Sequence, residues 1–397
     1  MEAIHDYFVK RPGNIDNGKH TACGCRSGHS YYSMVQGQKR WELVVTEEKL
    51  QQLDQPLEEP ELDVQGFESP RLLMDAVEED LVPLLDLAHR PVISARQFSR
   101  DQLIQISRLA AKFETEPQRI TRPLTGKILI SAFYEPSTRT RLSFESAWHR
   151  LGGDIMSITD PATTGIAKGE SLYDVGEMLN NYGDMVVLRD SDEKAVYEML
   201  ESLRIPIVNG GNGIDEHPTQ AMADIYAILK AHPELAKQEQ VSEDQKIRIG
   251  IVGVPGRMRT IRSLLLFLTH FSRGIEEIVI VADDNDIFSD GQKDELAQSG
   301  LELRVTDNLQ KELPHLDVVY INTIAWVSGG YEEHGNSYRL DSSSPFKPGA
   351  IVLHPLARGE ELDRSLDQTP YNWYFAQARG AVFIRMALLS AILKSYS

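Results

Sequence analysis

The stretch ILISAFYEPSTRTRLSFESAWHRL, residues 128–151, indicates the class of fold. Its first six residues form an apolar run of strand length, and turn residues follow it. From Thr140 to Leu151 the pattern is that of a helix. A short buried strand that leads through a turn into a helix is the unit from which parallel sheets covered by helices are built.

Similar apolar runs recur along the chain and are separated by helical stretches. Two of them accompany the first run, at residues 184–188 and 205–208. A second series follows the long helical stretch 217–231 and comprises residues 247–252, 278–282, 318–322 and 351–353. This alternation predicts parallel sheets with helices on both faces, and ligands in such folds bind where strands end and helices begin.

The two series predict an α/β protein of two domains, each a parallel β-sheet flanked by helices. We place the first domain at residues 92–230 and the second at 231–397, with a final helix that is able to return to the first domain. Residues 1–91 form an N-terminal extension of unknown role, for which assembly and control are the two options considered. The active site is expected in the cleft between the domains.

The N-terminal extension has a composition of its own. Residues 31–45, with Gly37 and Gln38 in the middle, predict a hairpin, and residues 71–88 predict a helix that Pro83 interrupts. Both cysteines lie in this segment, and metal binding is one interpretation of the set His20, Cys23, Cys25 and His29. Because Cys-x-Cys is not a common zinc spacing, we expect reduced thiols and assign no metal.

The charge and the apolar content limit the classes of partner. A formal net charge of −18 argues against nucleic acid as the main partner, although clustered arginines still allow a small anionic substrate. The longest apolar run, Leu264 to Leu268, is far shorter than the roughly 20 residues of a membrane span. Two cysteines make no disulfide framework, and the N-terminus lacks the apolar core of a signal peptide, so we expect a cytoplasmic protein.

The turn after the first strand carries the strongest chemical signal, EPSTRTR at residues 135–141. Ser137, Thr138 and Thr140 offer hydroxyl groups at a helix N-terminus, and Arg139 offers a planar fork of N–H donors. Such an arrangement binds phosphate well. The alternative is a helix cap beside a solvated arginine, and the spacing alone leaves both interpretations open.

Another turn, which is rich in glycine, resembles a dinucleotide-binding loop only superficially. Gly250, Gly253 and Gly256 follow a strand and precede a helix, but their spacing is G-x-x-G-x-x-G, and Pro255 lacks an N–H group that could face phosphate. A nicotinamide-dependent oxidoreductase is therefore the rival enzyme class, supported by a weak motif.

The EPSTRTR motif resembles the carbamoyl phosphate signature of the aspartate and ornithine carbamoyltransferase family. Further motifs occur in the family's order: Lys168-Gly-Glu170, His217-Pro-Thr-Gln220, His354-Pro-Leu356 and the C-terminal stretches 373–377 and 385–389. The resemblance extends from about residue 92 to residue 394, and His-Pro-Leu favours the aspartate branch. It implies transfer of the carbamoyl group of carbamoyl phosphate to the amino group of aspartate, a step of pyrimidine biosynthesis, without cofactor or metal.

The resemblance also implies roles for individual residues. The residues that match the family's phosphate-binding residues are Ser137, Thr138, Arg139 and Thr140. Those that match its contacts to the carbamoyl group are Arg189, His217, Gln220, Pro355 and Leu356. Those that match its contacts to the amino acid are Arg259, which binds the α-carboxylate, Leu356, and Lys168, which a neighbouring subunit supplies on a loop. The implied assembly is a homotrimer with shared sites, with a regulatory partner as an option. Catalysis would rest mainly on Arg139, Thr140, Lys168, Arg189 and His217.

The half of the site that should bind the amino acid departs from the family. Where aspartate enzymes carry Arg-x-Gln, the chain has Thr323 and Ala325, and a threonine cannot replace a bidentate guanidinium. We expect Arg339 or Arg257 to bind the side-chain carboxylate of aspartate instead, with Arg339 preferred for its loop position. The alternatives are a different acceptor amine, or a catalytically weak relative with a scaffold role.

Overall fold

The computed structural model describes residues 32–35, 38–41, 69–237, 241–283, 286–323 and 338–394. The chain divides into two compact units, Met1–Glu61 and Leu62–Ser397. In the first unit β1 (Tyr32–Val35) pairs antiparallel with β2 (Gln38–Trp41), which confirms the predicted hairpin. All other described elements belong to the second unit.

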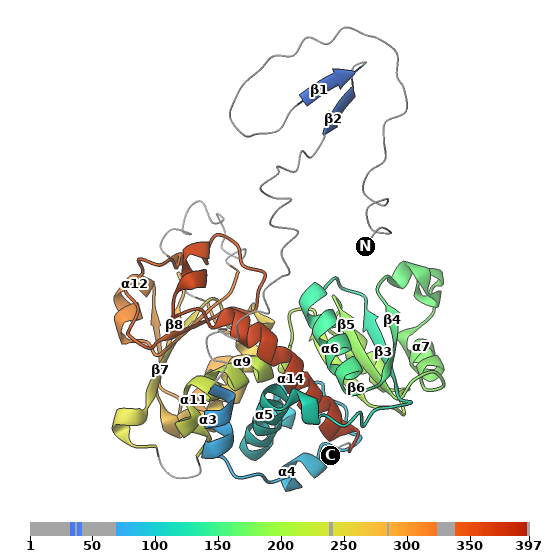
Figure 1. The fold of residues 1–397 in the computed structure, drawn as a ribbon, viewed down its shortest axis with the longest axis horizontal. Coiled ribbons are helices and arrows are strands. Elements are labelled where there is room, and N and C mark those ends of the chain that lie inside the picture. Colours follow the sequence, from blue (N-terminus) through green and yellow to red (C-terminus); the bar gives the residue numbers. More distant parts are fainter. Residues whose placement is uncertain are drawn as a thin grey trace, which may run out of the picture. The chain divides into compact units, whose positions relative to one another are not determined.

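The first sheet of the second unit has four parallel strands in the order β4-β3-β5-β6. Its strands are β3 (Ile128–Phe133), β4 (Asp154–Ile158), β5 (Met185–Asp190) and β6 (Ile207–Asn212). Its helices are α6 (Thr138–Arg150), α7 (Leu172–Leu179) and α8 (Ala195–Leu200), grouped around the green strands in Figure 1.

The second sheet has five parallel strands in the order β11-β10-β7-β8-β9. Its strands are β7 (Ile247–Val252), β8 (Ile275–Val281), β9 (Leu303–Thr306), β10 (Val318–Ile321) and β11 (Ile351–Leu353). Its helices are α10 (Arg259–Leu268), α11 (Gln292–Gln298) and α12 (Leu309–Glu312). Two parallel sheets with flanking helices confirm the predicted fold class, while the domain limits 92–230 and 231–397 stay a prediction.

Three helices lie beside the sheets and share a core with them. They are α5 (Arg100–Thr115), α9 (Pro218–Ala231) and α14 (Tyr374–Ile392), and α14 contacts α5, α6 and α9 (Figure 1). One apolar cluster takes in residues of both sheets and of these helices. At its centre the buried Glu114 accepts hydrogen bonds from Tyr226 Oη at 2.6 Å and Lys230 Nζ at 3.2 Å, so the carboxylate links α5 to α9.

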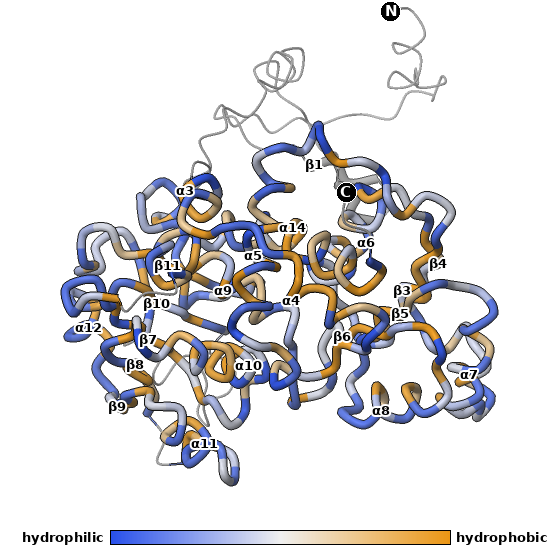
Figure 2. The backbone as a smooth tube through the Cα atoms, turned by 90° about the horizontal axis from the view of Figure 1, so that it is seen from below, coloured by the Kyte–Doolittle hydropathy of each residue, from blue (hydrophilic) through white to orange (hydrophobic). Residues whose placement is uncertain are grey.

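The helix α14 is long and apolar enough to span a membrane, a feature that the sequence analysis overlooked. Most of its residues are buried against protein, however, as in the core helix of a soluble domain. In Figure 2 the tube is hydrophobic along much of α14 and α10 and hydrophilic along α12.

Two predictions about secondary structure were incomplete. The helix expected at 71–88 is two short helices, α3 (Ser69–Ala76) and α4 (Val82–Leu85), because Pro83 starts a new helix rather than bending an existing one. The strands β4 and β9 were missed. Both lie at sheet edges, and their mixed exposure gives them no apolar run.

Candidate active site

A cavity of about 320 Å³ lies at the carboxyl ends of the strands of both sheets. Its walls follow β3, β5, β6, β7, β10 and β11, as parallel α/β folds lead one to expect. The lining residues are Ser137, Arg139, Thr140, Arg189, Gly213, Ile214, His217, Gln220, Arg257, Met258, Arg259, Thr260, Asn322, Pro355 and Leu356. The structure therefore brings together most of the residues predicted from the sequence.

Three helices begin at this cavity. Arg139 and Thr140 in the first turn of α6, Arg259 at the start of α10, and His217 immediately before α9 all line it. The first turn of a helix has backbone N–H groups without helical partners and carries a partial positive charge. Together with four arginines, and with no acidic side chain among the described lining residues, these termini make the cavity a site for anions.

The turn between β3 and α6 forms one end of the cavity. Ser137 occupies the cap position of α6, yet its side chain makes no capping hydrogen bond, so the hydroxyl is available to a ligand. Arg139 and Thr140 line the cavity as well, whereas Thr138 is exposed and does not. The capping interpretation of the motif is thus not realised by Ser137.

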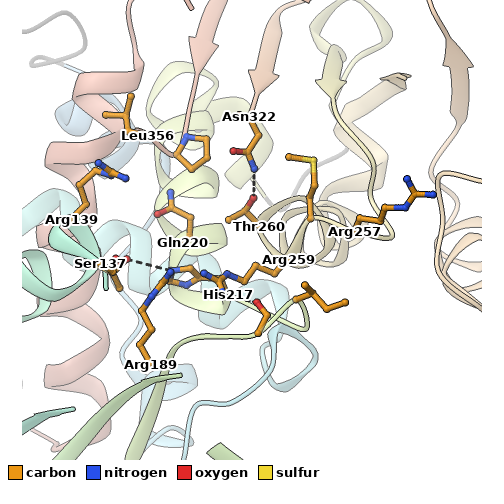
Figure 3. Close-up of a pocket in the computed structure, with 15 residues that line it drawn as sticks. Ser137, Arg139, Arg189, His217, Gln220, Arg257, Arg259, Thr260, Asn322 and Leu356 are labelled. Carbon is orange, nitrogen blue, oxygen red and sulfur yellow. Dashed lines mark hydrogen bonds between the residues drawn. The ribbon is translucent and has the colours of Figure 1, made fainter. Parts of the chain in front are cut away.

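Two arginines, Arg189 on β5 and Arg259 at the start of α10, meet at one carboxylate. Arg189 Nη2 donates to Glu135 Oε1 at 2.6 Å, and Arg259 donates to both oxygens of Glu135 at 3.2 and 3.3 Å. Figure 3 shows the two guanidinium groups extending toward one another from opposite sides. Arg189, which is mostly buried, forms an ion pair with Glu135.

The imidazole of His217 lies beside this arginine pair. It is fully enclosed, and burial together with Arg189 and Arg259 holds its pKa well below the usual value. The ring is therefore neutral at physiological pH and can still donate one N–H. Its Nε2 lies 3.5 Å from Thr140 Oγ1, and its backbone N–H donates to Ser263 Oγ at 3.1 Å.

Pro355 and Leu356 form the opposite wall, on the loop after β11. The two arginines predicted to replace the missing family arginine, Arg257 and Arg339, differ in their position relative to the cavity. Arg257 borders the cavity, and its guanidinium points away from Arg139 and Arg189 (Figure 3). Arg339 does not border it and pairs with Asp363. In this structure the loop position that motivated the preference for Arg339 does not bring its side chain to the cavity, and the choice between the two arginines stays a prediction.

Other predicted residues lie outside the cavity of their own chain. Lys168 ends a short 3-10 helix, Gly165–Lys168, and its side chain is exposed. Thr323 does not line the cavity, and its hydroxyl donates to the carbonyl of Ala357 at 3.0 Å. Ala325 lies outside the described residues, as do His20, Cys23, Cys25 and His29. Among the described residues no cluster of three or more metal-ligating side chains occurs.

The glycine-rich turn after β7 has no backbone N–H groups to offer a dinucleotide. Gly253 N–H donates to Val281 O at 3.1 Å, and Gly256 N–H donates to Ile287 O at 2.8 Å. Val254 N–H contacts Met258 Sδ at 3.3 Å. A phosphate-binding loop needs such groups unpaired, so the nicotinamide interpretation has no structural support.

Sequence reasoning missed several residues behind the cavity. Glu135 stood inside the EPSTRTR motif but was given no role. Gly211 has φ +111°, and a β-carbon there would come within 2.8 Å of Arg189 Nη1, so only glycine fits beside that arginine. Asp224 Oδ1 accepts from Gln220 Nε2 at 2.8 Å and from Gln377 Nε2 at 2.6 Å. Its position one helical turn after Gln220 was the signal available in the sequence.

Comparison with known proteins decides the family. Residues 90–230 match the carbamoyl-P binding domain of aspartate/ornithine carbamoyltransferases, and residues 245–392 match the Asp/Orn binding domain. The chain belongs to the aspartate/ornithine carbamoyltransferase family. It is 37% identical to the aspartate carbamoyltransferase catalytic subunit of Pyrobaculum islandicum over 311 residues, which cover 77% of this chain and 98% of that protein. The corresponding subunit of Cellvibrio japonicus is 34% identical, with 76% and 91% covered.

Solved structures of carbamoyltransferases have the same fold. The aspartate transcarbamoylase of Trypanosoma cruzi in complex with carbamoyl phosphate and aspartate superposes with a TM-score of 0.72 at 31% sequence identity, and covers 79% of this chain and 98% of that one. Its complex with carbamoyl aspartate and phosphate has a TM-score of 0.70 at 31% identity, with 79% and 99% covered. The resemblance seen in the motifs is thus confirmed over both sheets.

Proposed function

We propose that this carbamoyltransferase family member transfers the carbamoyl group of carbamoyl phosphate to the amino group of aspartate. The observation that carries the proposal is the convergence of Arg139, Arg189, Arg257 and Arg259 on one cavity whose described lining has no acidic side chain. Carbamoyl phosphate and aspartate together bring a phosphate and two carboxylates into contact with these four guanidinium groups. The relatives described above are named for this reaction.

The residues at the α6 end hold the phosphate. Ser137 and Thr140 offer hydroxyl groups, Arg139 offers a guanidinium, and the helix N-terminus adds backbone N–H groups. Negative charge grows on this group as the bond to the carbamoyl carbon breaks, so the same contacts stabilise the leaving group. Thr138, exposed and outside the cavity lining, contributes through its backbone position in the first turn.

The carbamoyl carbonyl oxygen is stabilised by Thr140, Arg189 and His217. When the neutral amine of aspartate attacks the carbamoyl carbon, an oxyanion develops on this oxygen, and donors held in place beforehand lower the barrier. The neutral His217 ring supplies an N–H without adding charge. Gln220 and the Pro355–Leu356 loop contact the carbamoyl amide and the amine. No side-chain nucleophile is required, and positioning provides much of the rate.

The acceptor side uses two arginines. Arg259 binds the α-carboxylate of aspartate, and Arg257 takes over the side-chain carboxylate that Thr323 cannot bind. Support comes from the position of Arg257 on the cavity wall and from the cost of leaving a carboxylate without a cation there.

The active assembly is a homotrimer in the cytoplasm, with Lys168 completing the site of a neighbouring subunit. Support for the sharing is that Lys168 is exposed and does not line the cavity of its own chain. A regulatory partner is compatible with this arrangement, and residues 1–91 are the segment available for it.

A radiolabelled carbamoyl transfer assay across a panel of amino acids tests the proposal. We expect labelled carbamoyl aspartate, together with binding of carbamoyl phosphate and no binding of NAD in calorimetry. If an amine without a second carboxylate is carbamoylated and aspartate is not, the protein is still a carbamoyltransferase, but its acceptor is that amine. Binding without turnover on any amine would favour the scaffold alternative, and a folded sample that binds no carbamoyl phosphate would refute the proposal.

A further inference from the structure

The loop that carries Pro355 and Leu356 is held from behind by His354, which is 1% exposed. Three hydrogen bonds fix this residue. Its backbone N–H donates to Gln377 Oε1 on α14 at 2.8 Å, and its Nδ1 lies 2.8 Å from the backbone N of Leu356. Its Nε2 lies 3.0 Å from Glu361 Oε1. Both ring nitrogens therefore have a partner inside the protein.

The partners decide which nitrogen carries the proton. A backbone N–H can only donate, so Nδ1 of His354 must accept from Leu356 and is unprotonated. The ring proton is then on Nε2 and is donated to the Glu361 carboxylate. Burial lowers the pKa of His354, although Glu361 opposes this effect, and the neutral ring is the form that the contacts require. The carboxylate of Glu361 thus specifies the tautomer.

The Glu361 side chain is itself held in place. It is 2% exposed, and its Oε1 also accepts from the backbone N–H of Gly359 at 2.6 Å. Its backbone carbonyl accepts from Leu340 N–H at 2.9 Å. A carboxylate with these bonds cannot turn away from His354 without leaving a buried N–H unpaired.

The bond to His354 has a consequence for the cavity wall. Leu356 has φ +55°, a left-handed conformation that is unfavourable for a residue with a side chain. Such a conformation persists when its surroundings hold it, and here the Leu356 N–H is held by Nδ1. Because Pro355 has no N–H and that of Leu356 is occupied, these two residues can offer the cavity only carbonyl oxygens. Carbonyl oxygens accept hydrogen bonds from amine and carbamoyl N–H groups.

We propose that His354 and Glu361 are positioning residues: Glu361 sets the tautomer of His354, and His354 holds Leu356 so that its loop presents only hydrogen-bond acceptors to the nitrogen groups of the substrates. The proposal rests on the proposed function for the identity of those groups. Neither side chain lines the candidate active-site cavity, and His354 borders only a smaller adjoining cavity of about 100 Å³. The hydrogen bond from Leu356 N–H to Nδ1 is the contact through which the pair acts on the active-site wall.

A pair of amide substitutions separates this role from general packing. In His354→Asn the amide oxygen lies near the place of Nδ1 and can still accept from Leu356. In His354→Gln it lies near the place of Nε2 and cannot. We expect His354→Gln to lower kcat roughly 100-fold, the loss typical of a misplacement of about 1 Å, and His354→Asn to stay within about tenfold of the parent. The Kd for carbamoyl phosphate should change little in either variant, because the phosphate contacts lie on the opposite wall.

The tautomer can be measured without any turnover. In the parent protein labelled with 15N-histidine, two-bond 1H–15N spectra assigned with His354→Gln should show the Nε2-protonated form, and Glu361→Gln should convert part of it to the Nδ1-protonated form. An Nδ1-protonated His354 in the parent, or equal loss of kcat in folded His354→Asn and His354→Gln, would overturn the proposal. If the parent binds carbamoyl phosphate but carbamoylates no amine, the proposed function fails, while the tautomer measurement still judges His354 and Glu361.

Discussion

Replacing Arg257 by alanine tests how the site binds the second carboxylate of aspartate. Arg257 borders the cavity, and Thr323, at the position where the sequence resemblance predicts an arginine, is hydrogen-bonded to Ala357 instead. A hydrogen bond to a charged group contributes about 1.5–3 kcal/mol, and every 1.4 kcal/mol changes an equilibrium tenfold. Because Arg257 is exposed, solvent screens part of this interaction, and the expected rise in KM for aspartate is about 10–100-fold.

The assay is the initial rate of labelled carbamoyl aspartate formation at saturating carbamoyl phosphate with aspartate varied. Arg257→Lys should lie between the parent and Arg257→Ala, because a lysine keeps the charge but loses the planar fork. Arg339→Ala is the matched control: this arginine pairs with Asp363 outside the cavity, in an exposed pair worth about 0–1 kcal/mol. A KM for Arg257→Ala within twofold of the parent, or a large rise in Arg339→Ala alone, would refute the assignment.

Three further predictions follow from the same geometry. Mixing inactive Arg139→Ala and Lys168→Ala proteins should recover activity by forming intact shared sites, and no recovery despite subunit exchange shown by mass spectrometry would exclude sharing. His217→Ala should lower kcat about 100–1,000-fold while the unfolding midpoint stays within a few degrees, since the lost group is a donor to the oxyanion. Burial raises the pKa of Asp224 to about 7. The folded protein then binds the proton that the unfolded chain has released, so this group's contribution to stability is lost as pH rises from 3.8, the usual pKa of aspartate, to about 7. In Asp224→Asn that loss should disappear. When the free energy of unfolding is measured with denaturant between pH 5 and 8, its change with pH should differ between variant and parent by up to about 1.4 kcal/mol per pH unit below pH 7. The same pH dependence of the free energy of unfolding in Asp224→Asn and in the parent would contradict the raised pKa of Asp224.

The fold could be predicted where strands are buried on both faces. The runs 128–133, 247–252 and 351–353 coincide with β3, β7 and β11, because a strand that is buried along most of its length has a mainly apolar sequence. The edge strands β4 and β9 are partly exposed and have no such run, so no local sequence pattern predicts them. The helix α14 was identified from a motif, but its burial among α5, α6 and α9 is a tertiary property.

The candidate site could be predicted where a motif follows a strand. Ser137, Arg139, Thr140, Arg189, His217, Gln220, Arg259, Pro355 and Leu356 all line the cavity, since the carboxyl ends of parallel strands meet at one edge. The choice between Arg257 and Arg339 could not be made in the same way. Both are arginines near the expected region, and only the path of the loop decides which one reaches the cavity.

The sequence by itself determined the class of fold and, through the order of its motifs, the family, and it marked residues 135–141 as a candidate phosphate site. These depend on strand–helix order and on residues that are close in sequence. The tertiary structure decided which side chains of the site pair with one another and which protonation state they have. Glu135 lies 54 residues from Arg189 and 124 from Arg259, yet it pairs with both. His217 is neutral because it is buried beside these arginines, and His354 has a defined tautomer because Glu361 and Leu356 lie on either side of it. Burial and electrostatic interaction depend on distance in space, and only the folded chain sets those distances.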